Sequence, residues 1–347
     1  MTPRNRVAVL DLQDRRTAWR ISESAVKALV NVLPGDWTVR VVAAETFGLG
    51  DGGHVGASVL DSVRGAEVYV GYGIARETFL AATLPPGSRL SWVHSAGVGM
   101  RSSLFPDLVA SDVTLTNSRD VQARAMAETA IAMLFHFARG LDHAVTAQAR
   151  SSWDTTAFDE LRGIGELGGE SLGIVGFGSL GRAVADLATA LGMRVTALRR
   201  RPGVDAVPGV RIVTGPDGLR DLLSSSAYVV VCVPDTPLTE GLIGRHELEL
   251  LSPRTVLVNL SRGAVLDEEA LVAALPRLRG VALDVFAHEP LDSASPLWTA
   301  PNVLVTPHVS ATSPRHWDRQ LALLQENFTR YLTRKPLLNT VDKSAGY

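Results

Sequence analysis

The sequence predicts an α/β fold with two lobes, each built on a parallel sheet that helices cover on both faces. Three observations carry this prediction. Short apolar runs alternate with polar or helical stretches through residues 6–117, and the same alternation returns over residues 172–306. A G-x-G-x-x-G turn between a strand pattern and a helix pattern occurs only in the second stretch. The 347 residues, 46% of them hydrophobic, are enough for about two domains with a core in each.

The strands of the first lobe are predicted from apolar runs separated by turn signals. A helical pattern covers residues 15–33, and Pro34 with Gly35 ends it. This half of the chain has no glycine fingerprint for a nucleotide, so we expect it to serve the substrate. The predicted strands are residues 7–10, 39–42, 68–70, 90–93 and 113–116.

Two glycine-rich loops, residues 71–73 and 95–99, each follow a predicted strand of this lobe. Ligands in open α/β sheets bind beyond the carboxyl ends of the strands. Glycine-rich loops there can turn several backbone N–H groups toward an anion. We therefore expect the 95–99 loop to contact a substrate; the alternative is an ordinary flexible loop.

Residues 121–150 predict a long helix with a break near Gly140, because no proline interrupts them. The apolar stripe of this stretch has helical spacing, which is typical of a core helix. Because the stretch lies between the two lobes in the sequence, an interdomain hinge with a dimer contact is the alternative. The stripe consists of Met126, Ala130, Met133, Leu134 and Phe137.

A dinucleotide-binding unit is predicted from the strand, glycine turn, helix and strand between residues 172 and 198, in which Gly192 ends the helix. The first glycine of the turn permits a tight bend, the second lets backbone approach a pyrophosphate, and the third lets the helix pack on the strand. The helix N-terminus then faces the phosphates with exposed N–H groups. The alternative is a glycine-rich turn in another kind of α/β protein. The motif consists of Gly176, Phe177, Gly178, Ser179, Leu180 and Gly181.

Beyond this unit the alternation continues, which completes a doubly wound lobe. Asp267 is predicted to cap a helix that runs to Leu275. Ser313 and Pro314 are predicted as N-cap and first residue of a last helix, whose apolar face must dock on the first lobe. The strands are residues 228–233, 256–260, 281–286 and 303–306, and the apolar face consists of Trp317, Leu321, Leu324, Phe328 and Tyr331.

Charge and composition exclude several classes of protein. The 34 basic and 36 acidic residues nearly cancel, so we expect no nucleic-acid partner. No apolar stretch is long enough to span a membrane, and Asp11 cuts the first apolar run too short for a signal peptide. Cys232 is the single cysteine, which excludes an intrachain disulfide and fits a reducing compartment. We expect a cytoplasmic protein.

Three polar residues follow predicted strands of the second lobe, where ligands collect: Arg262, Glu289 and His308. An arginine can bind a carboxylate with two parallel hydrogen bonds and polarise the neighbouring carbonyl. A histidine exchanges protons near neutral pH, and a carboxylate beside it favours the imidazolium and orients the ring. Each residue alone has an ordinary structural explanation, but together they are what a 2-oxo acid reductase needs.

At these motifs the chain resembles the D-isomer-specific 2-hydroxyacid dehydrogenases. The resemblance runs over nearly the whole chain. It implies an oxidoreductase that binds NAD(P) and acts on a small 2-oxo or 2-hydroxy acid. The motifs that carry it are residues 92–99, 116–118, 127–128, 176–181, 233–237, 259–263, 284–286, 289–290, 306–308 and 336–341.

The resemblance also implies roles for single residues. Arg262 binds substrate, His308 is the acid/base, Glu289 supports His308, and Asp284 contacts the nicotinamide amide. The substrate carboxylate is bound by the backbone around Val98 and Gly99, within the segment Ala96, Gly97, Val98 and Gly99. The implied cofactor contacts are the six fingerprint residues with Arg199, Arg200, Val233, Pro234 and Asp284.

For the domains, the resemblance implies a Rossmann nucleotide-binding domain over residues 118–307. This domain is inserted into a flavodoxin-like substrate domain, which is split into residues 1–117 and 308–347. A homodimer through the nucleotide-binding domain is implied as well.

The chain departs from the family pattern where the second strand of the fingerprint unit ends. The family often has an acidic residue there, which binds the ribose 2′-hydroxyl of NAD. Here the chain reads Arg199, Arg200 and Arg201, whose planar donors suit a phosphate. We therefore expect NADP(H) to be preferred, with NAD(H) as the alternative cofactor. Ala287 also replaces a residue that is commonly acidic in the family.

The leading hypothesis is the reduction of a 2-oxo acid, glyoxylate, hydroxypyruvate or a longer one, to the (R)-2-hydroxy acid. Formate is set aside, because formate dehydrogenases of similar sequence have a glutamine at the place of Glu289. A nucleotide-sensing regulatory scaffold without turnover is one alternative, and a dehydrogenase of another small anion such as phosphite is another. No Cys/His cluster predicts a metal site and no G-x-S-x-G motif predicts a hydrolase.

Overall fold

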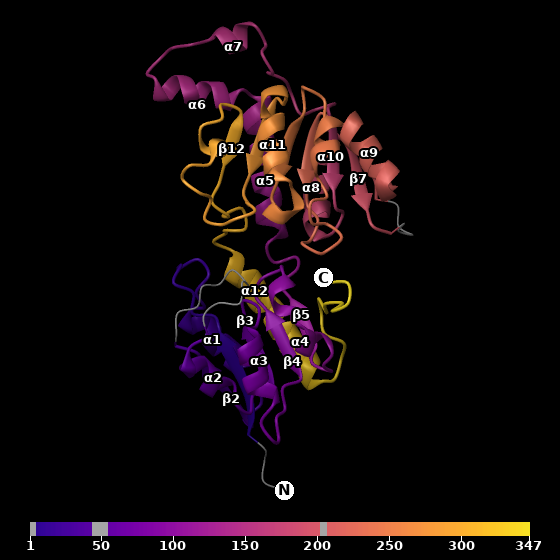
Figure 1. Cartoon of the computed structure of the whole chain (residues 1–347). Helices are drawn as coiled ribbons and strands as arrows, with labels where there is room; N and C mark the ends of the chain where they lie inside the picture. Colours follow the sequence, from indigo (N-terminus) through magenta and orange to yellow (C-terminus); the bar gives the residue numbers. More distant parts are fainter. Residues whose placement is uncertain (1–4, 44–54, 202–206) are drawn as a thin grey trace. The chain divides into compact units, whose positions relative to one another are not determined.

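A computed structural model describes residues 5–43, 55–201 and 207–347 of the chain. Its contacts divide the chain into two units (Figure 1). Unit 1 consists of Met1–Gln122 and Thr312–Tyr347, and unit 2 consists of Ala123–Ala311. Unit 2 is thus inserted in the sequence of unit 1, and both boundaries lie a few residues beyond the expected positions. The predicted fold class, two α/β lobes on parallel sheets, is confirmed.

Unit 1 contains a parallel sheet with the strand order β2-β1-β3-β4-β5. This is the flavodoxin-like order, in which the chain switches direction between β1 and β3. The strands are β1 (Arg6–Asp11), β2 (Trp37–Val41), β3 (Val68–Gly71), β4 (Trp92–Ser95) and β5 (Thr114–Asn117). The helices are α1 (Glu23–Val30), α2 (Ala57–Val63), α3 (Arg76–Thr83), α4 (Pro106–Val109) and α12 (His316–Leu332), with a 3₁₀ turn over Arg101–Ser103.

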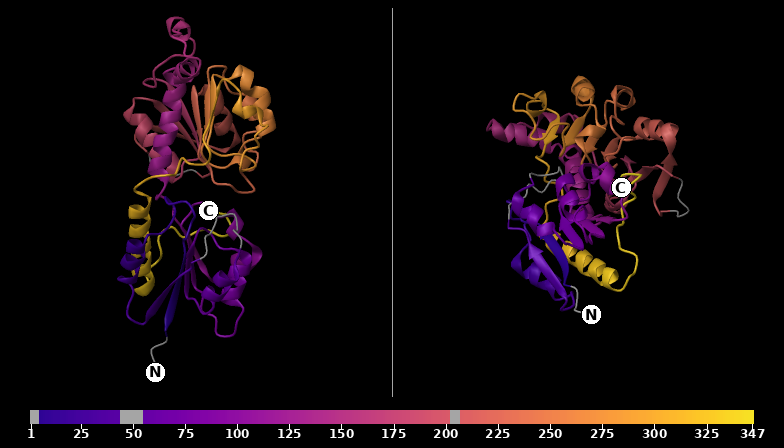
Figure 2. Two further views of the ribbon diagram at one scale, coloured as in Figure 1. Left: turned by 90° about the vertical axis from the view of Figure 1, so that its left-hand side faces the viewer. Right: turned by 60° about the horizontal axis from the view of Figure 1, so that its bottom comes forward.

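Each face of the unit 1 sheet buries its own apolar core, because successive residues of a strand point to opposite faces. Tyr69 and Phe79 belong to the core on the side of α2 and α3. Leu10, Trp92 and Phe328 belong to the core on the other side, where α1 and α12 lie next to each other (Figure 2). The prediction that the last helix docks on the first lobe is therefore confirmed.

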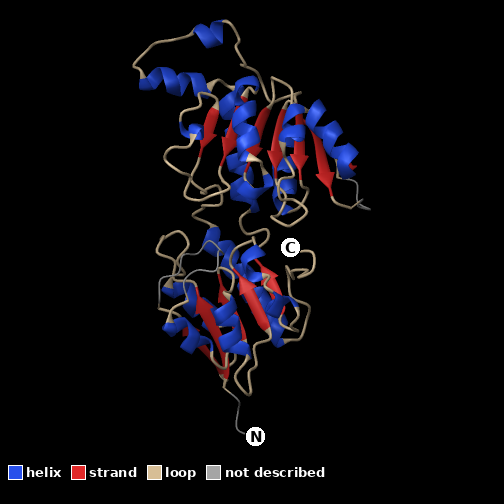
Figure 3. Cartoon of the chain, in the orientation of Figure 1, coloured by secondary structure: helices blue, strands red, loops and turns tan. Residues whose placement is uncertain are grey.

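Unit 2 contains a second parallel sheet, with the order β12-β11-β10-β9-β6-β7-β8. From β8 to β11 this is the Rossmann order, with β6 at the centre and β12 added at one edge. Helices flank both sheets (Figure 3). The strands are β6 (Ser171–Val175), β7 (Arg194–Arg199), β8 (Val210–Thr214), β9 (Tyr228–Val231), β10 (Val256–Asn259), β11 (Gly280–Leu283) and β12 (Val303–Val305).

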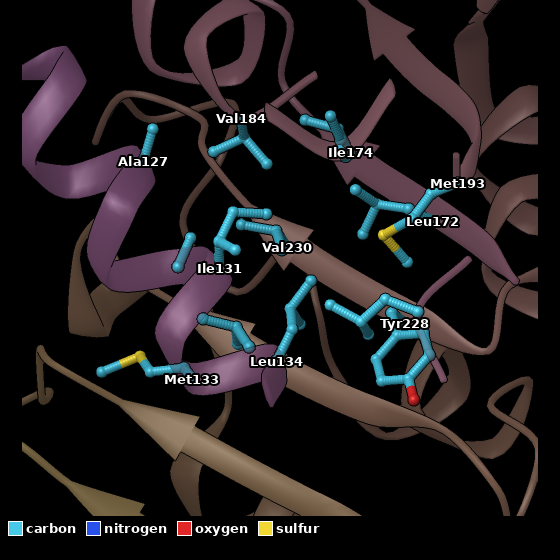
Figure 4. Packing of buried hydrophobic residues seen from close by; sticks show 14 of the residues in the cluster. Ala127, Ile131, Met133, Leu134, Leu172, Ile174, Val184, Met193, Tyr228 and Val230 are labelled. Atoms are coloured by element: carbon cyan, nitrogen blue, oxygen red, sulfur yellow. The ribbon is translucent and has the colours of Figure 1, made fainter. Parts of the chain in front are cut away.

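Two helices, α5 (Ala123–Ala138) and α8 (Ser179–Ala190), cover one face of this sheet. Figure 4 shows Ile131 and Leu134 of α5 directed at strand residues such as Leu172 and Val230. The other face packs against α9 (Gly215–Ser225), α10 (Arg245–Glu249) and α11 (Glu268–Ala274). The remaining elements are α6 (Leu141–Ala149), α7 (Thr156–Asp159) and the 3₁₀ turns Gly263–Val265, Leu275–Arg277 and Pro296–Trp298.

Several expected helix ends are confirmed. Gly140 adopts a φ of 65° and separates α5 from α6. Gly192, with a φ of 80°, follows α8; its N–H donates to the carbonyl of Thr189, and the N–H of Met193 donates to that of Ala188, the Schellman pattern. Asp267 caps α11 by accepting the N–H of Ala270.

Two expectations were wrong in detail, and one strand was missed. The helix expected over residues 15–33 is only Glu23–Val30, because Asp14 accepts the backbone and side-chain N–H groups of Arg16 and so forms a turn. The last helix begins at His316 rather than at Pro314. The strand β8 was not expected, because an edge strand needs apolar residues on fewer sides and its residues are mostly half-exposed.

Candidate active site

The fingerprint turn between β6 and α8 has the three glycine environments that a dinucleotide site requires. Gly176 has a φ of 103°, and a Cβ there would lie 2.8 Å from the backbone N of Val233. A Cβ on Gly181 would lie 2.2 Å from the carbonyl oxygen of Gly176, so only glycine lets α8 pack this closely. A Cβ on Gly178 meets nothing within 4 Å, which leaves this position open to a ligand.

The N-terminus of α8 is also built for an anion. Gly178 is its N-cap, and among the described residues no side chain caps the helix. The first-turn N–H groups, including those of Ser179 and Leu180, therefore face the phosphate position. Phe177 is buried in the core on the side of α5 and α8, with the guanidinium of Arg182 5.0 Å from its ring centre. The residues present fit the pyrophosphate of a dinucleotide.

Arg199 is the last residue of β7, the strand next to β6, so it lies at the carboxyl edge of the sheet. Arg199 is half-buried, whereas Arg200 and Arg201 are exposed. Val233 and Pro234 follow β9 on the other side of β6, in a loop where the hydroxyl of Thr239 donates to the carbonyl of Pro234 at 2.6 Å. Apart from Asp284, which follows β11, the predicted cofactor residues thus lie at or just after the ends of three adjacent strands, β7, β6 and β9.

His308 and Glu289 form a direct pair. Nδ1 of His308 lies 2.7 Å from Oε2 of Glu289, and Oε1 of the same carboxylate accepts the N–H of Phe286 at 3.0 Å. Burial raises the pKa of Glu289, but the hydrogen bond and charge of His308, the N–H of Phe286 and the charge of Arg262 together bring that pKa below its ordinary value. The carboxylate is therefore ionised near neutral pH and places a negative charge beside the His308 ring.

The backbone around His308 is held by Asp284. His308 occupies the left-handed region, with a φ of 52°, and its N–H donates to the carbonyl of Asp284 at 2.9 Å. The buried Asp284 carboxylate accepts the hydroxyl of Thr306 and the N–H of Val309 on Oδ1, and the N–H of Ser310 on Oδ2. Three of its roughly four acceptor sites are thus engaged in positioning residues 306–310.

Arg262 follows β10, the strand next to β11. The fully buried Asn259 shapes this loop: its Nδ2 donates to the carbonyl of Arg262 at 3.1 Å, and its Oδ1 accepts the N–H of Ser261 at 3.0 Å. A Cβ on Gly263 would lie 1.8 Å from the carbonyl carbon of Phe286, so the loops after β10 and β11 are in direct backbone contact. This contact brings the Arg262 loop to the Glu289 loop.

The predicted substrate loop lies in unit 1, directly after β4. Ala96 is buried, and Gly97 is half-buried, whereas Val98 and Gly99 are exposed. The structure therefore presents only the second half of this segment at the surface of the unit.

Three further residues that shape these loops were not singled out from the sequence: Asn117, Asn259 and Gly263. The signal available was their position at or just after the end of a strand, within the quoted motifs. In the described part of the chain, no group of three or more His, Cys, Asp or Glu side chains could hold a metal ion. No helix of that part is long and apolar enough to cross a bilayer.

Comparison with known proteins supports the family resemblance. Residues 131–310 match the family described as D-isomer specific 2-hydroxyacid dehydrogenase, NAD binding domain. Glyoxylate/hydroxypyruvate reductase A from Photorhabdus laumondii is 32% identical over 270 residues, which cover 75% of this chain and 82% of that protein. D-3-phosphoglycerate dehydrogenase from Synechocystis is 35% identical over 230 residues, 65% of this chain, and the chain spans only 40% of the length of that relative.

One similar solved structure is the NADPH-dependent glyoxylate/hydroxypyruvate reductase from Sinorhizobium meliloti, in complex with NADP and sulfate. The match has a TM-score of 0.79 and 26% sequence identity, and it covers 99% of this chain and all of that one.

Proposed function

This chain belongs to the D-isomer specific 2-hydroxyacid dehydrogenase family, and we propose that it is an NAD(P)-dependent enzyme that reduces a 2-oxo acid to the (R)-2-hydroxy acid. The observation that carries the proposal is the pair of His308 and Glu289, 2.7 Å apart, on the sheet edge that also holds Arg262 and the fingerprint turn. A general acid, an arginine and a dinucleotide cradle are the parts that this reaction requires.

In the proposed reaction, His308 holds the proton that passes to the carbonyl oxygen of the substrate. Because Nδ1 of His308 bonds Glu289, Nε2 is the atom left for the substrate. Arg262 binds the substrate carboxylate and polarises the adjacent carbonyl. The nicotinamide, when bound, supplies the hydride that adds to the carbonyl carbon. Asp284 holds the backbone of residues 306–310 and has one acceptor site left for the nicotinamide amide.

For the substrate we propose a small 2-oxo acid such as glyoxylate or hydroxypyruvate, with longer 2-oxo acids as the alternative. The similarity to reductases of glyoxylate and hydroxypyruvate supports this class. We propose that the backbone N–H groups of Val98 and Gly99 bind the carboxylate. A carboxylate can accept all of these donors, because its two oxygens offer about four acceptor sites.

For the cofactor we propose a preference for NADP(H). The support is the run of three arginines at the end of β7, where an acidic residue would repel a 2′-phosphate. The similar Sinorhizobium reductase is NADPH-dependent and was solved with NADP.

We also propose a homodimer through unit 2. Its support is the segment with α6 and α7, which projects from the body of that unit (Figure 1) and carries exposed apolar side chains, among them Val145, Trp153 and Leu161. Light scattering that finds only monomer at micromolar concentration would contradict this.

The decisive experiment is a panel of 2-oxo acids with NADPH and NADH, followed by chiral analysis of the product. We expect turnover of at least one short 2-oxo acid and formation of the (R)-2-hydroxy acid. Absence of turnover with every member of the panel, or an (S) product, would refute the proposal. Phosphite and formate with either oxidised cofactor serve as negative controls.

A further inference from the structure

In the loop after β4, the first two backbone N–H groups of residues 96–99 are hydrogen-bonded within the described structure, and the last two are not. The N–H of Ala96 donates to the carbonyl of Gly71 at 2.7 Å, and the N–H of Gly97 donates to Oγ of Ser95 at 3.2 Å. In the described part of the chain, no hydrogen bond uses the N–H of Val98 or of Gly99. Only these two N–H groups of the proposed substrate segment are therefore available to a ligand.

The two peptide groups that carry these N–H groups have carbonyls that are both hydrogen-bonded. The carbonyl of Gly97 accepts the N–H of Ser118 at 3.1 Å. The carbonyl of Val98 accepts Nδ2 of Asn117 at 3.1 Å. Both donors come from the end of β5, which lies next to β4 in the sheet. The end of β5 thus anchors the loop through two consecutive peptide groups.

This anchoring sets the direction of the unused N–H groups. A trans peptide is planar, so its C=O and the following N–H point in opposite directions. The carbonyl of Gly97 shares a peptide with the N–H of Val98, and the carbonyl of Val98 shares one with the N–H of Gly99. Because both carbonyls point toward the end of β5, both N–H groups point away from it. Adjacent N–H groups of this kind suit an anionic oxygen.

The side chain of Asn117 is itself fixed in one orientation. Asn117 is the last residue of β5 and pairs in register with Ser95, the last residue of β4, and both are buried. Oδ1 of Asn117 accepts the N–H of Arg119 at 3.2 Å, which directs Nδ2 toward the carbonyl of Val98. The amide therefore holds the Val98–Gly99 peptide through a donor that a second hydrogen bond orients.

From this geometry we infer that Asn117 is a positioning residue for substrate, because it holds the Val98–Gly99 peptide so that its N–H faces the carboxylate of the 2-oxo acid. The inference rests on the proposed function and assigns a further residue to it. Asn117 touches neither substrate nor cofactor in this assignment; it acts through the peptide. Its loss should weaken binding of the carboxylate and leave binding of the cofactor unchanged.

The chain provides a matched control in Asn327 of α12. Asn327 is fully buried, its Nδ2 donates to the carbonyl of Leu338 at 3.2 Å, and its Oδ1 accepts the N–H of the same residue at 2.7 Å. Asn327 thus makes the same two kinds of bond as Asn117 in the same unit, but with a different segment. Its replacement should lower thermal stability without changing substrate binding.

The experiment compares Asn117→Ala and Asn117→Asp with Asn327→Ala. The aspartate keeps the acceptor for Arg119 but has no N–H for Val98, so it is a second variant should the alanine fail to fold. For each variant, KM and kcat are measured with the best 2-oxo acid. Titration calorimetry gives the dissociation constants for NADPH and for oxamate, an inert 2-oxo acid analogue. Melting temperatures report folding.

We expect both Asn117 variants to raise KM and the oxamate dissociation constant about 10-fold or more, as for loss of a hydrogen bond to a charged group. The dissociation constant for NADPH should stay within about twofold of the wild-type value, a smaller change than the loss of one hydrogen bond would cause. Folded Asn117 variants with wild-type KM and oxamate affinity, or an equal rise in Asn327→Ala, would overturn the inference. If the wild type reduces no 2-oxo acid, the proposed function fails and the inference fails with it; an active wild type with unaffected Asn117 variants refutes the inference alone.

Discussion

Nδ1 of His308 lies 2.7 Å from Oε2 of Glu289, and the two residues come from loops that follow neighbouring strands of unit 2. The carboxylate holds Nδ1 and so orients the imidazole ring. The ring is thereby ready to give a proton through Nε2. This pair gives the first two predictions.

Replacing His308 by alanine should reduce kcat for 2-oxo acid reduction by about 10²–10⁴-fold, the usual contribution of a general acid. NADPH binding should be retained, because the fingerprint turn lies elsewhere on the sheet edge. Steady-state kinetics and fluorescence titration of NADPH measure the two effects. His246→Ala, an exposed histidine on α10, is the control and should behave as wild type. Near-normal turnover in His308→Ala would exclude the assignment.

Replacing Glu289 by glutamine should lower kcat/KM for reduction throughout the neutral range. The pKa of the Glu289 carboxyl is brought below its ordinary value by His308, the N–H of Phe286 and Arg262 against the opposing effect of burial, so the carboxylate is charged throughout the neutral range. Glutamine removes this negative charge from beside Nδ1 of His308, so the pair loses its charge-assisted hydrogen bond. The measurement is kcat/KM against pH, with Asp292→Asn in the same loop as control. A profile equal to the wild-type one would count against the pair.

Arg262→Lys should raise KM for the 2-oxo acid about 10-fold or more, since an ammonium group cannot reproduce two parallel hydrogen bonds to a carboxylate. The carbonyl of Arg262, which Asn259 holds, is unchanged in this variant, so the loop should keep its conformation. Melting temperature and NADPH affinity should therefore match the wild type. An unchanged KM would contradict the role of the guanidinium.

The wild type should prefer NADPH over NADH by about tenfold or more in kcat/KM, as expected for charge-assisted hydrogen bonds to a 2′-phosphate. The double variant Arg199→Ala/Arg200→Ala should lose most of this preference. Arg194→Ala, an exposed arginine at the opposite end of β7, is the matched control and should keep it. An equal or better value with NADH in the wild type would refute the prediction, as would a double variant with unchanged preference.

His316→Phe should make unit 1 less sensitive to acid. Burial, with a smaller contribution from the charge of Arg319, lowers the pKa of His316 from 6.5 to about 4, and neither ring nitrogen has a hydrogen-bond partner in the described structure. The folded state therefore keeps the ring neutral while the unfolded chain binds a proton. The stability associated with His316 is fully present above pH 6.5 and is lost as the pH falls toward 4.

In His316→Phe this loss disappears. The free energy of unfolding should therefore fall less steeply with acidification, with a slope smaller than that of the wild type by about 1.4 kcal/mol per pH unit in that range. The phenyl ring can keep the contacts with Trp19 and Trp317. Urea unfolding at several pH values provides the measurement. His94→Phe is the contrast, because the His94 ring bonds Thr116 and Ser118 and its loss should destabilise the protein at every pH. Parallel curves for wild type and His316→Phe would contradict the prediction.

Much of the fold and part of the candidate site could be predicted from the sequence, because the signals are local. Apolar runs identified the strands of the described residues except β8, and most of these strands bury both faces, which requires a continuous apolar run. The fingerprint could be recognised because the roles of Gly176, Gly178 and Gly181 depend on one turn between a strand and a helix. His308, Glu289 and Arg262 were candidates because polar residues after parallel strands share one edge of the sheet.

What the sequence left open depends on contacts between distant residues. Asn117 and Val98 are 19 residues apart, and only the pairing of β4 with β5 brings the amide to the carbonyl and leaves the N–H of Gly99 unused. Gly263 is required because the backbone of Phe286 passes where its Cβ would lie. Residue type and spacing determine which local structure a segment prefers, whereas the packing of separate segments decides which hydrogen-bonding groups remain free for a ligand.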